Sequence, residues 1–341
     1  MTDPIRVLVV DDSAFMRKAL SREIAADARF VVAGTACNGE EGVQLALELK
    51  PDVITLDVEM PVQDGLETLR HLSMKSDAGV IMISAATEAG TQTTLDALAL
   101  GAIDFIPKAQ GMASLHEKLL AAALVRQRRG RALAQGPSNA GSPIVRPALP
   151  KGFRAKAIVI GSSTGGPQAL TELFMNLAPP LPVPVFIAQH MPAPFTAALA
   201  QRLSGLSGHH VAEAKDGDLI ENGTVYIGPG GMQLRVSEGG LSVSPDFGES
   251  AYQPSAGILA SSAFEVYGKN MLAIMLTGLG RDGAREFARL RDAGAWTIAQ
   301  DSASCTVFGM PKALIESGGA CEIMQPKSIA HRVEEILANR H

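Results

Sequence analysis

The sequence has little aromatic content and few cysteines. Aromatic side chains make up 4% of its 341 residues, which argues against the broad stacking surfaces that bind single-stranded nucleic acid. The three cysteines, Cys37, Cys305 and Cys321, are widely spaced and form no Cys-x-x-Cys pair. We therefore expect structural thiols in a reducing compartment.

The sequence also lacks the apolar runs that insertion into a membrane requires. The apolar run near the start is too short for the core of a signal peptide, and no stretch approaches the length of a membrane span. The formal net charge of −5 does not favour a nucleic-acid binder. These absences predict a cytoplasmic protein that neither binds nucleic acid nor inserts into a membrane.

The remaining composition suits a soluble α/β protein of two domains. Hydrophobic residues make up 46% of the chain and charged residues 19%, which supplies ample material for buried cores. The length favours two domains. We expect one domain at residues 1–124, a linker at 125–155 and a second domain at 156–341.

Short apolar runs alternate with helical patterns in the first domain. This alternation predicts a doubly wound parallel sheet of five strands, covered by helices on both faces. The strands are expected at residues 7–10, 30–33, 53–56, 80–83 and 103–106.

The polar residues at the carboxyl ends of these strands are of few types, mainly aspartates. Asp11 and Asp12 follow the first strand, Asp57 the third, Ser84 the fourth and Lys108 the fifth. Because these ends meet at one edge of the sheet, the three carboxylates would repel one another unless a hard divalent cation such as Mg²⁺ lay among them. A single aspartate pair would more often cap a helix, but the joint pattern favours a cation site.

With this acidic edge and residues 56–61 (LDVEMP), the first domain resembles a response-regulator receiver domain. The resemblance implies that Asp57 accepts a phosphoryl group from a histidine kinase. It also implies that Mg²⁺ is held by Asp11, Asp12, Asp57 and the carbonyl of Glu59. The conserved switch positions of receivers correspond here to Ser84, Phe105 and Lys108.

One departure from the receiver pattern concerns Lys108. Receivers usually carry Lys-Pro with a cis bond, whereas here the proline comes first, in Pro107-Lys108-Ala109. A cis bond before a residue other than proline costs about 2.5–4 kcal/mol. The usual loop geometry therefore does not carry over to this position.

The expected linker is basic and rich in proline, glycine, serine and alanine. Between Val125 and Lys156 the sequence has eight Lys or Arg residues and no Asp or Glu. This composition predicts a flexible tether. Its charge is either solvated, which is the interpretation we favour, or forms a docking patch for an acidic partner.

The second domain is organised around a sharp turn. Residues 157–160 suit a buried strand and Pro167 suits the first turn of a helix, so residues 161–166 must turn tightly. Gly161, Ser163 and Gly165 match the spacing Gly-x-Ser-x-Gly, in which a serine nucleophile stands at the top of a sheet. Alone, this motif is equally compatible with a phosphate-binding or a plain glycine-rich turn.

Further elements predict a second, mainly parallel α/β sheet. The other strands are expected at residues 183–188, 225–227, 271–276 and 295–299, with hairpins within 216–248. Helices are expected at 167–177, 194–203, 255–267, 282–293 and 329–338.

A base and an acid for Ser163 can be chosen by position. His190 ends a buried strand at the edge where Ser163 also lies, which favours a catalytic over a structural role. Asp282 follows the strand at 271–276 and is the best candidate to orient the histidine, although alone it would be taken for a helix cap. Weaker candidates, none of which follows so clear a strand, are Asp216, Asp218 and Asp301. The order Ser, His, Asp differs from that of the α/β-hydrolases.

This domain resembles the catalytic domain of the chemotaxis protein-glutamate methylesterase family, CheB. The matching stretches are residues 160–167 (IGSSTGGP), 189–192 (QHMP), 226–231 (YIGPGG), 276–283 (LTGLGRDG), 297–301 (TIAQD) and 309–311 (GMP). The resemblance assigns the triad to Ser163, His190 and Asp282, and an oxyanion donor to the backbone amide of Leu279. The departures are Ser162 for a usual alanine, Leu279 for methionine, and Ala256-Gly257 for Val-Asp.

The resemblance implies an enzyme that hydrolyses glutamyl methyl esters on chemoreceptors, releases methanol and serves adaptation in chemotaxis, with glutamine deamidation as a side activity. The ester reaction would need no cofactor. The receiver would cover the triad until the kinase CheA phosphorylates Asp57, and we expect a monomer. Two other classes are a non-catalytic signalling module, which the intact triad disfavours, and a transcription factor, for which the second domain shows no helix-turn-helix.

Overall fold

The computed structural model describes residues 3–85, 87–108, 114–135, 148–245 and 250–338. The chain divides into two compact units, residues 1–142 and 143–341. Both units are α/β, as the sequence predicts. Across the described residues, no helix combines the length and the hydrophobicity that crossing a bilayer requires.

The first unit contains one parallel sheet of five strands in the order β2-β1-β3-β4-β5. The strands are β1 (Ile5–Val10), β2 (Phe30–Ala36), β3 (Val53–Asp57), β4 (Gly79–Ser84) and β5 (Asp104–Pro107). All five expected strands are confirmed. β3, β4 and β5 are buried along their whole length, as a parallel sheet between helix layers requires, whereas the edge strand β2 is partly exposed.

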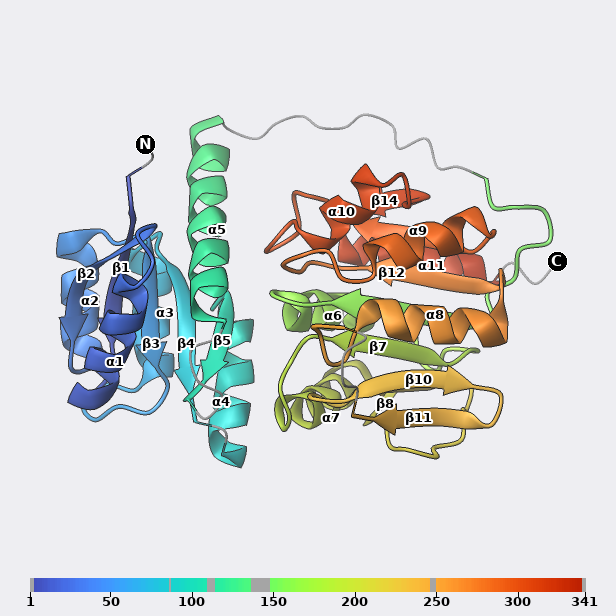
Figure 1. Ribbon diagram of the computed structural model, residues 1–341, viewed down its shortest axis with the longest axis horizontal. Helices are drawn as coiled ribbons and strands as arrows, with labels where there is room; N and C mark the ends of the chain where they lie inside the picture. Colours follow the sequence, from blue (N-terminus) through green and yellow to red (C-terminus); the bar gives the residue numbers. More distant parts are fainter. Residues whose placement is uncertain (1–2, 86, 109–113, 136–147, 246–249, 339–341) are drawn as a thin grey trace. The chain divides into compact units, whose positions relative to one another are not determined.

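The helices of the first unit are α1 (Ala14–Ala25), α2 (Gly39–Leu49), α3 (Gly65–Lys75), α4 (Glu88–Ala99) and α5 (Leu115–Gln135). Right-handed crossovers place α1 on one face and α2 to α4 on the other (Figure 1). His116 of α5 contacts the carbonyl of Glu23 in α1 at 2.8 Å, so α5 packs beside α1. The winding direction changes at β1 and β3, where the strand-end aspartates lie.

The second unit contains a parallel sheet of seven strands in the order β14-β13-β12-β6-β7-β9-β8. Its strands are β6 (Ala157–Ser162), β7 (Val185–Gln189), β8 (His210–Glu213), β9 (Thr224–Ile227), β12 (Met271–Met275), β13 (Trp296–Gln300) and β14 (Glu322–Met324). The separate antiparallel hairpin β10 (Gln233–Ser237) and β11 (Gly240–Ser244) confirms the hairpin expected within residues 216–248.

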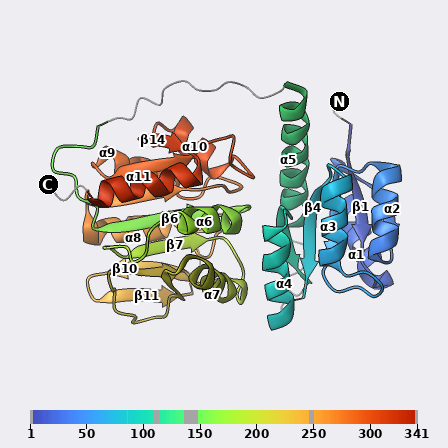
Figure 2. The same cartoon turned by 180° about the vertical axis from the view of Figure 1, so that it is seen from behind.

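The helices of the second unit are α6 (Gly166–Met175), α7 (Phe195–Ser207), α8 (Ala256–Tyr267), α9 (Ala284–Asp292), α10 (Met310–Glu316) and α11 (Pro326–Ala338). Figure 1 shows α8 and α9 on one face of the sheet, and Figure 2 shows α6, α7 and α11 on the other. From β6 the chain winds one way through β7 and the other way through β12. The carboxyl end of β6 is therefore the point at which open α/β sheets place their ligand sites.

The linker differs from the expectation at both of its ends. Helix α5 continues to Gln135, and Arg126 pairs with Asp52 of the receiver. Phe153 is buried with its ring 6.3 Å from that of Trp296, so it belongs to the second unit. Of the eight basic residues, Arg128, Arg129, Arg131 and Arg146 have side chains outside the described residues.

Candidate active site

The turn after β6 presents Ser163. Its amide donates to the carbonyl of Thr277 at 3.0 Å, and its carbonyl accepts from Gly166 at 2.7 Å. Gly165 has φ 78° and no room for a Cβ, which would collide with Thr306. Only glycine suits this position, so the Gly-x-Ser-x-Gly spacing has a steric cause here.

A buried glutamine fixes the backbone on both sides of the site. The amide of Gln189 donates to the carbonyls of Ser163 at 3.0 Å and His190 at 3.1 Å. Its Oε1 accepts from the hydroxyl of Ser162 at 2.7 Å. Ser162 is fully buried with its hydroxyl engaged, whereas its neighbour Ser163 is partly exposed, so of the two hydroxyls Ser163 is the one a substrate can reach.

His190 follows β7 directly, and its amide donates to the carbonyl of Ser162 at 3.0 Å. Its Nε2 lies 2.8 Å from Oδ2 of Asp282. Its Nδ1 is buried and has no hydrogen-bond partner among the described residues. When the carboxylate fixes the proton on Nε2, the lone pair of Nδ1 is left free to accept a proton, which is the tautomer a general base needs.

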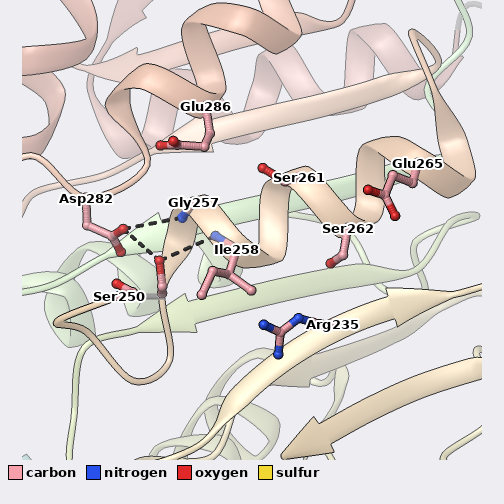
Figure 3. A pocket seen from close by; sticks show the side chains of 10 residues that line it. Arg235, Ser250, Gly257, Ile258, Ser261, Ser262, Glu265, Asp282 and Glu286 are labelled. Atoms are coloured by element: carbon pink, nitrogen blue, oxygen red, sulfur yellow. Dashed lines mark hydrogen bonds between the residues drawn. The ribbon is translucent and has the colours of Figure 1, made fainter. Parts of the chain in front are cut away.

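Asp282 lies between β12 and α9 and bonds to the start of α8. Figure 3 shows its carboxylate beside the first turn of α8, where the amide of Gly257 donates to it at 3.5 Å. The hydroxyl of Ser255 donates to it at 2.7 Å. The amide of Ala256 also donates to it, at 2.6 Å. A carboxylate at a helix N-terminus is stabilised by the free N–H groups and the helix dipole.

These contacts keep Asp282 ionised. Burial by itself would raise the pKa of this carboxyl, but the hydrogen bond and charge of His190 oppose it. The hydrogen bonds from Ser255 and Ala256 act in the same direction, so the pKa of Asp282 lies below its ordinary value. The acid thus stays charged and can stabilise an imidazolium.

The three weaker candidate acids bond to backbone amides away from His190. Oxygens of Asp216, Asp218 and Asp301 accept from the amides of Val243, Lys215 and Ser304, respectively. Leu279 lies in the turn after β12, and its amide has no hydrogen-bond partner within the described part of the chain. That amide is therefore available to a substrate oxygen.

Tyr252 lies beside His190 and was not predicted as a residue of the site. The ring of Tyr252 stacks on that of His190 with centroids 4.3 Å apart and an interplanar angle of 8°. Tyr252 lies in the loop before α8 and in no regular element. No local pattern in the sequence could have indicated this contact.

The receiver edge gathers the predicted acidic residues. Ligand oxygens of Asp11, Asp12 and Asp57 all lie within 4.8 Å of one another. Nζ of Lys108 lies 2.7 Å from Oδ2 of Asp57 and 3.5 Å from Oδ2 of Asp11. Oδ2 of Asp11 is buried without a hydrogen-bond partner among the described residues. Three carboxylates whose oxygens lie this close together are a set of hard ligands that fits a Mg²⁺ ion.

The pKa shifts at this edge show that its carboxylates repel one another and attract positive charge. Burial raises the pKa of Asp57 to about 6, with a further rise from the charge of Asp11 and an opposing effect of Lys108. Burial disfavours the ammonium of Lys108, but Asp57 outweighs this and raises the pKa of the lysine. Lys108 is one positive charge beside three carboxylates, and a bound cation would offset the remaining negative charge.

The other predicted receiver residues lie around this cluster. The hydroxyl of Ser84 is buried 2.6 Å from that of Thr94, and the ring of Phe105 is buried with Nζ of Lys118 5.3 Å from its centroid. The side chain of Glu59 is exposed, and its amide bonds to Asp57. The bond after Lys108 leads to Ala109, outside the described residues.

Comparisons with known proteins agree with this architecture. The CheB methylesterase family model matches residues 158–333, and the response regulator receiver domain model matches residues 7–120. The chain is 39% identical to the protein-glutamate methylesterase/protein-glutamine glutaminase of Symbiobacterium thermophilum, over 98% of this chain and 97% of that protein. It is 40% identical to the one of Halalkalibacterium halodurans, over 98% of each.

A solved structure matches the second unit. The crystal structure of the Thermotoga maritima CheB methylesterase catalytic domain covers 54% of this chain and 100% of that chain, with 36% identity and a TM-score of 0.51. Since the matches span both units and nearly the full length of the relatives, the chain belongs to the protein-glutamate methylesterase/protein-glutamine glutaminase family.

Proposed function

We propose that the chain hydrolyses glutamyl methyl esters on chemoreceptors, releases methanol and serves adaptation in chemotaxis. The family names of its relatives also support deamidation of protein glutamine, which uses the same acyl chemistry. The observation that carries the proposal is the orientation of His190. Its Nε2 is bound to Asp282, and its buried Nδ1 is left without a partner.

In the proposed reaction, Ser163 attacks the ester carbonyl while Nδ1 of His190 takes the proton of its hydroxyl. The bond to methoxide then breaks, and the imidazolium gives this proton to the leaving oxygen, so methanol departs. Asp282 stabilises the imidazolium throughout. Water attacks the acyl-enzyme in the same way and returns Ser163. The free amide of Leu279 stabilises the oxyanion.

The receiver is proposed to regulate this activity. Asp57 would accept a phosphoryl group from the chemotaxis histidine kinase CheA, with Mg²⁺ held by Asp11, Asp12, Asp57 and the carbonyl of Glu59. Such an ion neutralises charge on the transferred phosphoryl group. Lys108 lies close enough to Asp57 to pair with that group once it is attached. We further propose a cytoplasmic location and a monomeric enzyme.

Methanol release from methylated chemoreceptor membranes tests the esterase. Ser163→Ala is expected to reduce the rate by at least about 1,000-fold, because removing a nucleophile leaves only binding and the oxyanion donor. Ser162→Ala is the matched control and should stay within about threefold of wild type, because within the described residues its hydroxyl bonds to Gln189 and to neither His190 nor Asp282. If both variants keep the wild-type rate, Ser163 is not the nucleophile. Absence of release from folded wild type would point to a non-catalytic signalling role.

A further inference from the structure

The imidazole of His190 has only one hydrogen bond to hold it. Nε2 contacts Asp282 at 2.8 Å, whereas Nδ1 has no partner among the described residues. A ring that is held at one nitrogen can still change its tilt by rotation about the Cβ–Cγ bond. Such a rotation would change the direction in which Nδ1 points, and small errors in the position of a catalytic group cost enzymes up to about 100-fold in rate.

Tyr252 removes this freedom. Its ring lies nearly parallel to the imidazole, with an interplanar angle of 8° and 4.3 Å between centroids. Its hydroxyl lies over Gly280, where an added Cβ would come within 2.7 Å of the oxygen. Gly280 is thus small enough to let the phenol reach from the histidine to the turn that carries Leu279. The stacked aromatic surface also favours the imidazolium that forms during the reaction.

The backbone of Tyr252 is itself held from β10. Gln233 is fully buried, and its amide donates to the carbonyl of Tyr252 at 2.7 Å. Its Oε1 accepts from the amide of Ser255 at 2.8 Å, and the hydroxyl of Ser255 bonds to Asp282 at 2.7 Å. One buried amide therefore fixes both the residue that stacks on the histidine and a residue that holds the acid.

We propose that Tyr252 is a positioning residue for ester hydrolysis, which keeps the imidazole of His190 in the plane that directs Nδ1 to Ser163. This inference rests on the proposed function. The aromatic ring rather than the hydroxyl performs this task, because the contact with His190 is made by the stacked face.

The test compares wild type with Tyr252→Ala, Tyr252→Phe and the control Met232→Ala. Met232 is as exposed as Tyr252, at 36%. It lies nearby, because the amide of its neighbour Gly231 donates to the carbonyl of Gln253. Two readouts are used: kcat and KM for methanol release, and the rate at which a fluorophosphonate labels Ser163. In the labelling, the Ser163 oxygen bonds to phosphorus, the P–F bond breaks, fluoride leaves and His190 takes the proton.

Tyr252→Ala is expected to lower kcat and the labelling rate by about 10- to 100-fold with little change in KM. Tyr252→Phe and Met232→Ala should stay within about threefold of wild type. The inference is overturned if Tyr252→Ala labels Ser163 at the wild-type rate, if only KM changes, or if phenylalanine does not restore kcat. Normal labelling of wild type without methanol release would instead overturn the proposed substrate, and the labelling rates would still decide the role of Tyr252.

Discussion

At the scale of single residues, two of the histidines in the second unit, His190 and His209, lie in contrasting environments. His190 bonds to a carboxylate, whereas His209 is buried against the edge of Phe174 with Nε2 3.2 Å from the carbonyl of Leu177. Its Nδ1 has no hydrogen-bond partner among the described residues. Burial lowers the pKa of His209, and the bond to Leu177 opposes this only in part.

This burial makes stability depend on pH. The unfolded chain binds a proton at His209 below about pH 6.5, whereas the folded chain does so only at a lower pH. Between these two values the unfolded state binds more protons, so the free energy of unfolding decreases as pH falls, by at most about 1.4 kcal/mol per pH unit. Above about pH 6.5 this destabilisation is absent.

Urea unfolding between about pH 5 and pH 8 checks this expectation. Trp296 is the single tryptophan and is buried in the second unit, so its fluorescence reports on that unit. Wild type should lose stability relative to His209→Gln as pH falls. A difference between the two that is the same at every pH would contradict the expectation.

The residues of the site differ in how far the sequence reveals them. Ser163, His190 and Asp282 each follow an apolar strand of a parallel sheet, so their meeting at one edge could be predicted from order alone. Tyr252, Ser255 and Gln233 could not. Their roles depend on a loop and a hairpin that fold back to the site, and no periodicity in the sequence encodes that return.

At the scale of elements, the start of α8 has two functions at once. Ser255 caps the helix by accepting from the amide of Ile258, and its hydroxyl donates to Asp282. Glycine at 257 leaves the space beside the helix to the carboxylate of Glu286, whose Oε2 would lie 2.9 Å from an added Cβ. Figure 3 shows Glu286 beside this first turn of α8.

Ser255→Ala is expected to reduce the free energy of unfolding by about 0.5–2 kcal/mol, the usual effect of losing a cap. It should also lower kcat, because Asp282 loses one of the hydrogen bonds that fix it. Ser261→Ala, at an exposed position of the same helix, should change neither quantity appreciably. Denaturant unfolding and methanol release measure the two effects. Equal behaviour of both variants would show that the cap contributes nothing.

Elements were predictable when they were long or strongly apolar. The expected strands of both units are confirmed, whereas β14 has three residues and α10 has seven, which is too short for a clear pattern. The end of α5 was predicted as flexible linker because residues 125–155 are rich in proline, glycine, serine and alanine. Composition alone does not distinguish a helix from a tether.

At the scale of the whole molecule, the proposed phosphorylation site at Asp57 and the proposed hydrolytic site at Ser163 lie in separate units. The expected coupling can be measured without the kinase. Acetyl phosphate with Mg²⁺ should raise methanol release by about 5- to 150-fold, the usual range of coupling between sites. Asp57→Asn should abolish this rise and keep the basal rate. Chelating Mg²⁺ should have the same effect, since the three carboxylates then lack their cation.

Activation of Asp57→Asn to the wild-type level would show that the donor acts elsewhere. Activation in the presence of a chelator would show that the acidic cluster works without a metal. Ser163→Ala with the donor supplies the background rate for both comparisons.

The position of β6 has a consequence for synthesis on the ribosome. This strand comes first in its sheet along the chain, yet it lies in the interior and pairs with β7 on one side and β12 on the other. Until residues of β12 emerge, the growing chain exposes one whole edge of a strand that is fully buried in the folded protein, and such edges recruit other chains. A fragment that stops before Met271 thus combines an unfinished sheet with a serine and a histidine that have no acid, so the product of premature termination is both inert and prone to aggregate.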